Sequence, residues 1–352
     1  MVPGPPHAPV QPTLYDVARE AGVSTATVSR VLHGQERVRP ATRQRVLEVI
    51  EALGYVPDAA AQSMARQRKE VIGLFATENR SPDTEVEKEG LLFVEEVWRG
   101  VEAVLSRVEW SLLISSLNPA DPERAFQRML RVSGQVDGLL ITEGMIGSER
   151  LGQLAARTPL VLIAGSPDEP HADVFAVDNR SSTVALVTHL IERHRARRVF
   201  SVTGPPGAPD AVARQAAVEE VVARYPGVRL TGMFPGRFGS ADGERAAREI
   251  LGSPRADWPD AIVCANDQMA IGAVRELLSA GVRVPADIAV VGFDGVYAGA
   301  LMSPTLTTAR QEMGLLAERA CARLLDRIAN PTLPRHVELL PAELVVRESC
   351  GC

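Results

Sequence analysis

The 352-residue sequence predicts a mixed α/β protein, in which a small all-helical N-terminal domain precedes a larger body of two α/β lobes. Residues 13–54 repeat apolar side chains at helical spacing. Beyond Val71, short apolar runs rich in β-branched residues alternate with longer helical stretches, a pattern typical of parallel sheets covered by helices on both faces. Because this alternation continues almost to the C-terminus, it favours two lobes over one very large sheet.

The N-terminal domain, residues 12–57, is predicted to contain three short helices, and residues 1–11 are expected to form a disordered lead-in. Thr13 is placed to cap the first helix, Gly22 ends it, and Ser24 can cap the second. Pro40 begins the third helix and Gly54 ends it. Their inward faces are apolar: Leu14, Val17, Ala18, Ala21, Val28, Val31, Leu32, Val46, Val49, Ile50 and Leu53.

The second helix presents a face of small and hydrogen-bonding side chains, namely Thr25, Ala26, Ser29, Arg30 and His33. A helix, a glycine-centred turn and a second helix are typical of helix-turn-helix domains, whose second helix enters the major groove of DNA. Small side chains allow a close approach to base edges, and Arg30 can donate two hydrogen bonds to guanine. The alternative is an ordinary helical hairpin with a polar outer face.

Charge is divided unevenly along the chain, whose formal net charge is −6. Residues 1–69 contain nine Lys and Arg against six Asp and Glu, a net of +3, which leaves −9 for residues 70–352. A basic N-terminal domain suits a nucleic-acid partner, whereas the acidic remainder of the chain would repel one.

The two lobes are predicted from alternating strand and helix segments. Ligands of such folds bind beyond the carboxyl ends of the strands, commonly between two lobes. We expect strands at 71–76, 112–115, 138–142, 160–164, 174–177, 199–203, 261–265 and 288–293, and helices that include 93–106, 183–193 and 268–280.

The chain resembles the lac-repressor family of bacterial regulators, from Thr13–His33 through the stretches 53–57 and 61–65 to about Arg347. The resemblance implies a sequence-specific DNA-binding regulator that is not an enzyme. It also implies a homodimer on double-stranded operator DNA, and a repressor released from a pseudo-palindromic operator by a sugar or sugar-derived effector. Residues 70–347 would form a two-lobed effector-binding and dimerisation domain similar to periplasmic sugar-binding proteins. Alternative triggers are a purine or a protein co-regulator, and activation is an alternative to repression.

The resemblance also implies a hinge helix at residues 58–69 that folds on DNA and inserts an apolar side chain into the minor groove. The matching position here is Met64, where the family has leucine; a flexible linker is the alternative interpretation. So short a helix cannot persist in water without partners. The DNA-binding residues implied are Thr13, Leu14, Tyr15, Ser24, Thr25, Ala26, Thr27, Ser29, Arg30, His33, Tyr55 and Met64.

Candidate effector-binding residues follow the predicted strands. Arg214 and Asp294 match the family's ligand-binding residues, and an arginine fork beside carboxylates suits sugar hydroxyls. Asn266, Asp267 and Asp178 are alternatively plain helix caps. The further candidates are Phe238 and Phe93, which are alternatively core residues, and Gln311.

The predicted two-lobed domain departs from the family pattern in two places. Ala217 stands where the family usually has glycine, and residues 78–90 are expected to form a longer, more acidic loop than usual.

The sequence predicts neither a metal site nor a cofactor. The four cysteines are too few for a disulfide framework, which fits a reducing compartment. Residues 348–352 are expected to be a frayed tail, because no second ligand pair stands near Cys350 and Cys352 in the sequence; a metal at this pair is the alternative. His189 and His194 lack the spacing of a zinc-protease motif. The basic run 193–198 is interpreted as a solvated turn, not a second nucleic-acid patch.

Targeting and catalytic signals are not found. The proline-rich start lacks the apolar segment of a signal peptide, and no run is long enough to span a membrane, so we expect a cytoplasmic, nucleoid-associated protein. No nucleophile–base pair or glycine-rich cofactor loop supports an enzyme.

Overall fold

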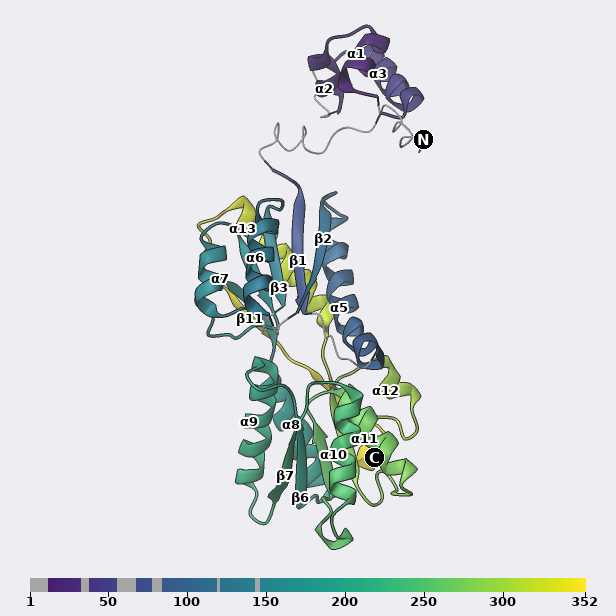
Figure 1. Ribbon diagram of the computed structural model, residues 1–352, viewed down its shortest axis with the longest axis vertical. Helices are drawn as coiled ribbons and strands as arrows, with labels where there is room; N and C mark the ends of the chain where they lie inside the picture. Colours follow the sequence, from purple (N-terminus) through teal and green to yellow (C-terminus); the bar gives the residue numbers. More distant parts are fainter. Residues whose placement is uncertain (1–11, 33–37, 56–67, 78–83, 119–120, 143–145) are drawn as a thin grey trace, which may run out of the picture. The chain divides into compact units, whose positions relative to one another are not determined.

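The computed structural model describes residues 12–32, 38–55, 68–77, 84–118, 121–142 and 146–352, without the side chains of residues 77 and 84–93 (Figure 1). The chain forms two compact units, Met1–Lys69 and Glu70–Cys352. The predicted lead-in of residues 1–11 and most of the predicted hinge at 58–69 lie outside the described residues.

The N-terminal unit contains the three predicted helices, α1 (Leu14–Ala21), α2 (Thr25–Leu32) and α3 (Pro40–Leu53). Thr13 and Asp16 cap α1 reciprocally: the Thr13 N–H donates to the Asp16 carboxylate at 3.0 Å, and the Asp16 N–H donates to the Thr13 hydroxyl oxygen at 3.4 Å. Gly22 (φ 64°) and Gly54 (φ 61°) end α1 and α3 in the left-handed conformation that glycine favours. The helices enclose a small apolar core of Val17, Ala18, Ala21, Val28, Val31 and Val46.

The C-terminal unit is built on two six-stranded sheets, with strand orders β11-β5-β4-β3-β1-β2 and β12-β10-β9-β8-β6-β7. Neighbouring strands run parallel except for β12, which pairs antiparallel with β10. The strands are β1 (Val71–Thr77), β2 (Ser111–Leu117), β3 (Gly138–Thr142), β4 (Leu160–Ile163), β5 (Asp173–Val177), β6 (Arg198–Thr203), β7 (Arg229–Pro235), β8 (Ala261–Cys264), β9 (Ala289–Asp294), β10 (Thr307–Arg310), β11 (Val337–Leu340) and β12 (Glu343–Val345).

Helices cover both faces of each sheet, as the sequence predicts (Figure 1). In the first lobe α5 and α13 pack on one face and α6 and α7 on the other. In the second lobe α8 and α9 cover one face and α10 and α11 the other. These helices are α5 (Thr84–Leu105), α6 (Pro122–Ser133), α7 (Ser148–Ala155), α8 (Asn179–His194), α9 (Pro209–Arg224), α10 (Ser240–Leu251), α11 (Asp267–Ser279), α12 (Tyr297–Leu301) and α13 (Met313–Ala329).

The chain crosses between the lobes three times: from β5 to α8, from β10 to α13, and from β11 to β12. The second crossing returns α13 to the first lobe, where Asp173 anchors it. Arg323 and Arg327 donate to the fully buried Asp173 carboxylate at 2.8 Å, and the backbone N–H of His336 donates to it at 2.7 Å. This carboxylate therefore joins β5, α13 and the segment before β11.

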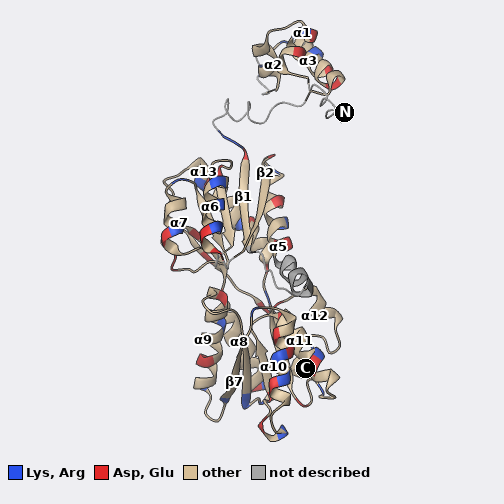
Figure 2. Ribbon diagram, viewed as in Figure 1, with Lys and Arg blue, Asp and Glu red and all other residues tan. Residues whose placement is uncertain are grey.

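Acidic and basic side chains are interspersed along the solvent-facing sides of α10 and α11 (Figure 2). Arg248, for example, pairs with Glu244 at 3.0 Å on its own helix and with Glu276 of α11 at 3.0 Å. Such mixed surfaces favour solubility over nucleic-acid binding. Among the described residues, no helix is both long enough and apolar enough to cross a bilayer.

Two sequence expectations about this unit are wrong. Residues 84–90, expected to belong to a loop, instead form the first turns of α5, which begins at Thr84; residues 78–83 lie outside the described residues. The frayed tail expected at 348–352 is instead packed: Ser349 is fully buried, and its hydroxyl donates to the carbonyl of Val290 in β9 at 2.6 Å. A short 3-10 helix, η2 (Glu348–Cys350), results.

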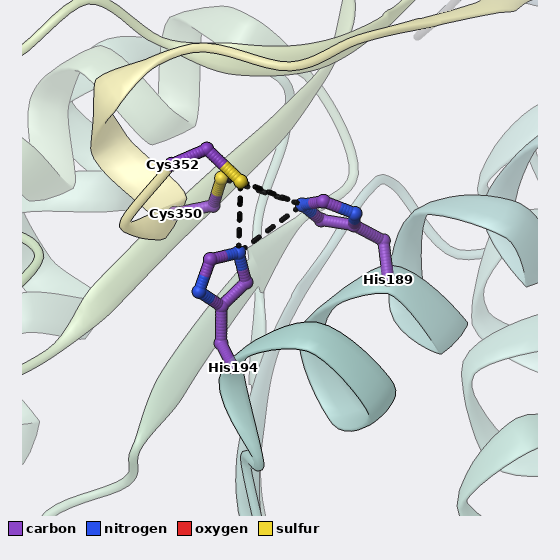
Figure 3. Close-up of side chains that lie close together, drawn as sticks. All are labelled: His189, His194, Cys350 and Cys352. Atoms are coloured by element: carbon purple, nitrogen blue, oxygen red, sulfur yellow. Dashed lines mark hydrogen bonds between the residues drawn. The ribbon is translucent and has the colours of Figure 1, made fainter.

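Cys350 and Cys352 were also expected to lack a second pair of ligands nearby, and this is wrong. The fold brings the two cysteines to the end of α8. There they meet His189 and His194 (Figure 3). The two pairs are about 160 residues apart in the chain, so their meeting depends on how the last strands cross the lobes.

Candidate DNA-binding surface and effector site

Helix α2 presents a polar face opposite its buried side. Val28 and Val31 are buried in the core of the N-terminal unit, whereas Ala26 and Arg30 are exposed. Thr25, Thr27 and Ser29 are half-buried on the flank of the same helix. This arrangement places a long cationic side chain among short ones on the outer face of α2, where the sequence predicts the DNA-reading surface.

The first turn of α2 is fixed by Ser24, whose hydroxyl oxygen accepts from the Thr27 N–H at 3.2 Å and lies 2.9 Å from the Thr27 hydroxyl. Tyr15, at the start of α1, is 75% exposed and therefore free to meet a partner. Leu14 and Tyr55 pack partly against the core, which gives both a structural role in addition to the predicted one. His33 and Met64 lie outside the described residues.

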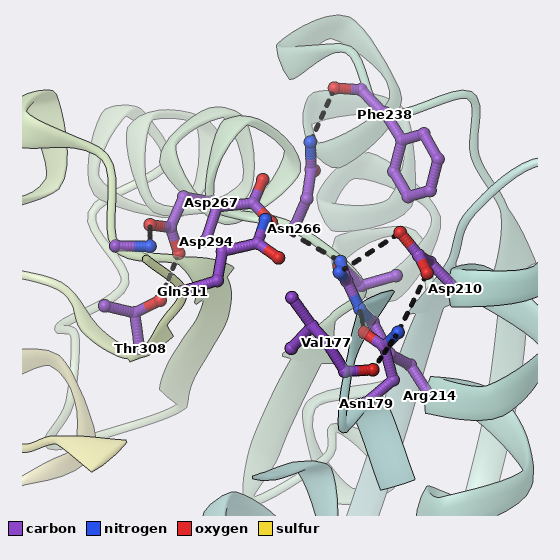
Figure 4. Close-up of polar contacts among 12 residues, drawn as sticks. Val177, Asn179, Asp210, Arg214, Phe238, Asn266, Asp267, Asp294, Thr308 and Gln311 are labelled. Carbon is purple, nitrogen blue, oxygen red and sulfur yellow. Dashed lines mark hydrogen bonds and ion pairs between the residues drawn. The ribbon is translucent and has the colours of Figure 1, made fainter. Parts of the chain in front are cut away.

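In the C-terminal unit, the predicted effector residues Arg214, Asp294 and Gln311 meet in one polar cluster, together with Asn179 and Asp210 (Figure 4). We call these five residues the Arg214 network. Asn179 begins α8, Asp210 and Arg214 belong to α9, Asp294 ends β9, and Gln311 follows β10. The network therefore lies in the second lobe, beside the points where the first crossing enters this lobe and the second leaves it.

Arg214 is held by two short hydrogen bonds and touches two carboxylates at longer range. Its Nε donates to Asn179 Oδ1 at 2.7 Å, and its Nη1 donates to the carbonyl of Ala265 at 2.6 Å. The distances from its guanidinium nitrogens to Asp294 Oδ1 and Asp210 Oδ2 are 3.5 and 3.8 Å. The short bonds fix the fork, and the longer contacts to the carboxylates leave acceptor positions on these groups for other hydrogen-bond donors.

Two neighbours complete the setting of this arginine. Its guanidinium stacks 3.7 Å from the ring centroid of Phe293, and its side chain is 5% exposed. Gln311 Nε2 donates to Asp294 Oδ1 at 2.7 Å, and Asn179 Nδ2 donates to Asp210 Oδ1 at 2.8 Å. A guanidinium this deeply buried is tolerated only when it is paired and hydrogen-bonded, as it is here.

The carboxylates of the network have altered acidity. Burial raises the pKa of Asp294 well above its ordinary value, opposed by the Arg214 guanidinium and reinforced by the nearby Asp267 and Asp210 carboxylates. Burial likewise raises the pKa of Asp210, against the effects of Arg214 and Asn179. A raised pKa favours the protonated carboxyl, so each of these groups can donate a hydrogen bond to a ligand oxygen when protonated and accept one from a ligand hydroxyl when ionised.

Asp294 also has an unusual backbone, with φ 119° in a region that favours glycine, and Gly295 follows at φ 81°. Asp267 stabilises this turn: its carboxylate accepts from the N–H groups of Gly295 and Val296 at 2.7 and 2.8 Å and from the Thr308 hydroxyl at 2.7 Å. Asp267 is therefore neither a simple cap nor free for a ligand. Strain held in place in this way is common at binding sites.

The remaining effector candidates lie at or near the network with different duties. Asp178 caps α8 by accepting from the Ser181 N–H at 3.0 Å, as the alternative interpretation proposed. Asn266 caps α11 through Met269 N and also donates to the carbonyl of Phe238 at 3.0 Å. Asn266 therefore caps α11 and also lies beside the strand ends where the effector is expected.

Of the two aromatic candidates, Phe238 is half-buried, partly packed against the core of the second lobe. Gly204 makes room for it, since a Cβ at that position would lie 2.5 Å from the Phe238 ring. Phe93 belongs to α5, but its side chain is outside what the structure describes.

Sequence reasoning missed Asp210 and the exact role of Asn179. Asp210 stands four residues before Arg214 on α9, a helical spacing that would have indicated the pair. Asn179, not its neighbour Asp178, bonds the guanidinium, and this one-residue difference depends on where α8 begins.

Comparison with known proteins adds two matched models. Residues 13–58 match the model of bacterial regulatory proteins of the lacI family, and residues 187–350 match that of a periplasmic binding protein-like domain.

Whole-chain similarity extends further. The chain is 31% identical over 348 residues to the HTH-type transcriptional repressor PurR of Aliivibrio salmonicida, covering 96% of this chain and 98% of that protein. It is 32% identical over 339 residues to the ribose operon repressor of Escherichia coli, covering 94% and 97%. Among solved structures, the lac repressor dimer bound to operator and an anti-inducer is similar, with a TM-score of 0.84, 26% identity and coverage of 96% of this chain and 99% of that one.

Proposed function

Since the chain belongs to the lacI family of bacterial regulatory proteins, and is thus a DNA-binding transcriptional regulator and not an enzyme, we propose that it represses genes from a pseudo-palindromic operator that it releases when a sugar or sugar-derived effector binds the Arg214 network. The observation that carries the proposal is the buried Arg214 fork, fixed by Asn179 and Ala265 but held only loosely by Asp294 and Asp210.

The donor and acceptor pattern favours a polyol. Adjacent hydroxyls of a sugar can each donate to a carboxylate and accept from a guanidinium, so one ring can bridge Arg214 to Asp294 and Asp210 at once. Phe238, half-buried beside the network, offers an apolar face for the C–H side of a ring.

Release of DNA would follow from the position of the network at the first crossing between lobes. The network lies in the second lobe, where Asn179 stands at the point at which the first crossing enters and Gln311 at the point from which the second crossing leaves. A ligand that bonds both residues therefore contacts the ends of two crossing segments. If the lobes have one arrangement that binds DNA and another that does not, such a ligand favours the arrangement that it binds more tightly.

On DNA, we propose that two copies of the N-terminal unit read two half-sites, with α2 in the major groove and Met64 as the minor-groove wedge. One short helix buries little surface, so a homodimer on a symmetric operator multiplies its affinity. The lac repressor structure similar to this chain is a dimer bound to its operator.

A purine effector is the second candidate, because several similar relatives carry the name HTH-type transcriptional repressor PurR. A purine presents a flat aromatic ring with few hydroxyls, so it would depend on stacking more than on the carboxylates. It would also act as a co-repressor if it tightened operator binding instead of weakening it.

The test begins with the operator. Purified full-length protein is mixed with fragmented genomic DNA at physiological salt, and protected fragments are sequenced with and without panels of sugars and purines. Binding of the recovered operator is then measured by fluorescence anisotropy at fixed salt, because affinity for DNA depends steeply on ionic strength.

We expect a sugar to raise the dissociation constant of the operator by roughly tenfold or more, a coupling of about 1.4 kcal/mol. A purine that lowers the constant, with no sugar active, would select the second candidate. The absence of any preference for a specific duplex over random competitor would refute DNA-sequence recognition altogether.

A further inference from the structure

Two histidines and two cysteines converge at the carboxyl end of α8, apart from the Arg214 network. His189 and His194 come from the last two turns of that helix, Cys350 ends η2, and Cys352 is the last residue of the sequence (Figure 3). The donor atoms of all four side chains lie within 4.8 Å of one another. The described residues contain no other such group of three or more potential ligands.

Four of the six distances between these donors are close to those around a single tetrahedral ion. With Zn–S bonds of about 2.3 Å and Zn–N bonds of about 2.05 Å, tetrahedral angles place two nitrogens about 3.4 Å apart and a nitrogen about 3.6 Å from a sulfur. The two Nε2 atoms are 3.2 Å apart. Cys352 Sγ lies 3.3 Å from His194 Nε2 and 3.7 Å from His189 Nε2, and Cys350 Sγ lies 3.5 Å from His189 Nε2.

The surroundings support ligand roles for these side chains. The Thr307 hydroxyl lies 3.1 Å from Cys350 Sγ, a polar contact that helps to orient this sulfur. Gly351, at φ 108°, lets the chain pass the imidazole of His194, since a Cβ there would lie 3.1 Å from His194 Nδ1. The backbone between the two cysteines is thus shaped around a histidine ring.

We propose that His189, His194, Cys350 and Cys352 bind one Zn²⁺ ion in a closed structural site that fastens the end of the chain to α8. Two thiolates and two imidazoles suit zinc, and exclude Mg²⁺ and Ca²⁺, which prefer oxygen ligands. Four protein ligands leave no open position, so the ion holds two segments together and performs no chemistry.

A disulfide between Cys350 and Cys352 is the competing fate of the two thiols. The two cysteines stand one residue apart and are both free in this structure. Oxidation would remove both sulfur ligands, so the two states are mutually exclusive and can be separated by counting thiols.

The test uses the untagged full-length chain, purified under reducing conditions and dialysed against a mild chelator. We expect one zinc ion per chain by elemental analysis and four free thiols after the metal is removed. Replacing zinc with Co²⁺ should produce the visible bands of tetrahedral cobalt and a thiolate-to-cobalt charge-transfer band in the near ultraviolet.

Variants assign the ligands. C352S changes an exposed terminal side chain and H194Q a half-buried one, and each should lower the zinc content from one ion per chain to near zero, with an unchanged circular dichroism spectrum. C321A and H336Q are matched controls from outside the cluster and should keep the full zinc content. The proposal is overturned if the wild-type chain holds no zinc and gives no charge-transfer band, if C352S keeps the metal, or if a Cys350–Cys352 disulfide forms under these conditions.

Discussion

At the scale of single residues, Arg30 is the long cationic side chain on the exposed face of α2. It follows the short side chains of Ala26 and Thr27 and lies in the last turn of the helix. We predict that R30A weakens operator binding by about 1–3 kcal/mol, because a bidentate contact to guanine is lost. The measurement is fluorescence anisotropy on the recovered operator and on a random duplex of equal length. R157A, which removes an exposed arginine from the other unit, should leave both affinities unchanged. An equal loss on both duplexes for R30A would show that Arg30 contacts phosphates and reads no base.

Asp294 is the residue whose change should separate effector binding from DNA binding. D294N keeps the size of the side chain and tolerates the positive φ better than alanine, but it removes the charge that faces Arg214 and the Gln311 amide. We predict that the operator affinity without effector stays the same, whereas the effector no longer changes it.

The matched control for D294N is D287N, which removes a carboxylate paired with Arg283 and Arg255 on the surface of the same lobe. Its effector response should equal that of the wild-type chain. If D294N still responds normally, the Arg214 network is not the effector site.

At the scale of elements, Asp173 fastens α13 to the first lobe. Burial by itself raises the pKa of this carboxyl, but the hydrogen bonds from Arg327, Arg323 and the His336 N–H outweigh burial and lower it. A carboxyl with a lowered pKa in the folded state stabilises that state above its unfolded pKa of about 4, and this contribution is lost as the pH falls through the folded pKa.

We predict that D173N lowers the free energy of unfolding of the C-terminal unit by about 3–5 kcal/mol at pH 7, because two arginines lose their buried counter-charge. The gap between the variant and the wild-type chain should narrow below about pH 4, as the wild-type carboxyl becomes protonated. Urea unfolding followed by circular dichroism at a series of pH values measures both effects. D168N, at an exposed carboxylate, should show neither; a gap that stays constant with pH would mean that packing, not charge, explains the loss.

The elements differ in how well the sequence predicts them. β3 and β4 are fully buried apolar runs, and the helices of the N-terminal unit have clear caps at Thr13, Gly22 and Gly54, so their patterns predict them nearly to the residue. β7 alternates exposed and half-buried side chains, and β10 and β12 are only four and three residues long. These short or edge strands are stabilised by their neighbours in the sheet and carry little signal of their own.

At the scale of the whole molecule, what brings residues together is the order of the strands and the three crossings. Arg214 and Asp294 could be paired from the sequence because both follow strands that end at one edge of a sheet. Asp267, next to Asn266, became a turn anchor because β9 and β10 deliver Gly295 and Thr308 to it. The meeting of His189 with Cys350 depends on the last crossing, which no local pattern in either segment reveals.

That last meeting leads to a prediction about the stability of the C-terminal unit. A ligand that binds the folded state and not the unfolded one stabilises it by RT ln(1 + [L]/Kd), about 2.7 kcal/mol at a free zinc concentration 100-fold above Kd. For a unit of this size, the gain corresponds to a rise of about 5 °C in Tm. We therefore expect a strong chelator to lower the Tm of the C-terminal unit in the wild-type chain by about that amount, and added Zn²⁺ to restore it.

The chelator should have no effect on C352S, whose Tm should match that of the metal-free wild-type chain. Equal shifts in both proteins would mean that zinc acts elsewhere. No shift in a wild-type chain that contains zinc would mean that the ion does not hold η2 to α8, since any tie that exists in the folded state alone must appear in the unfolding equilibrium.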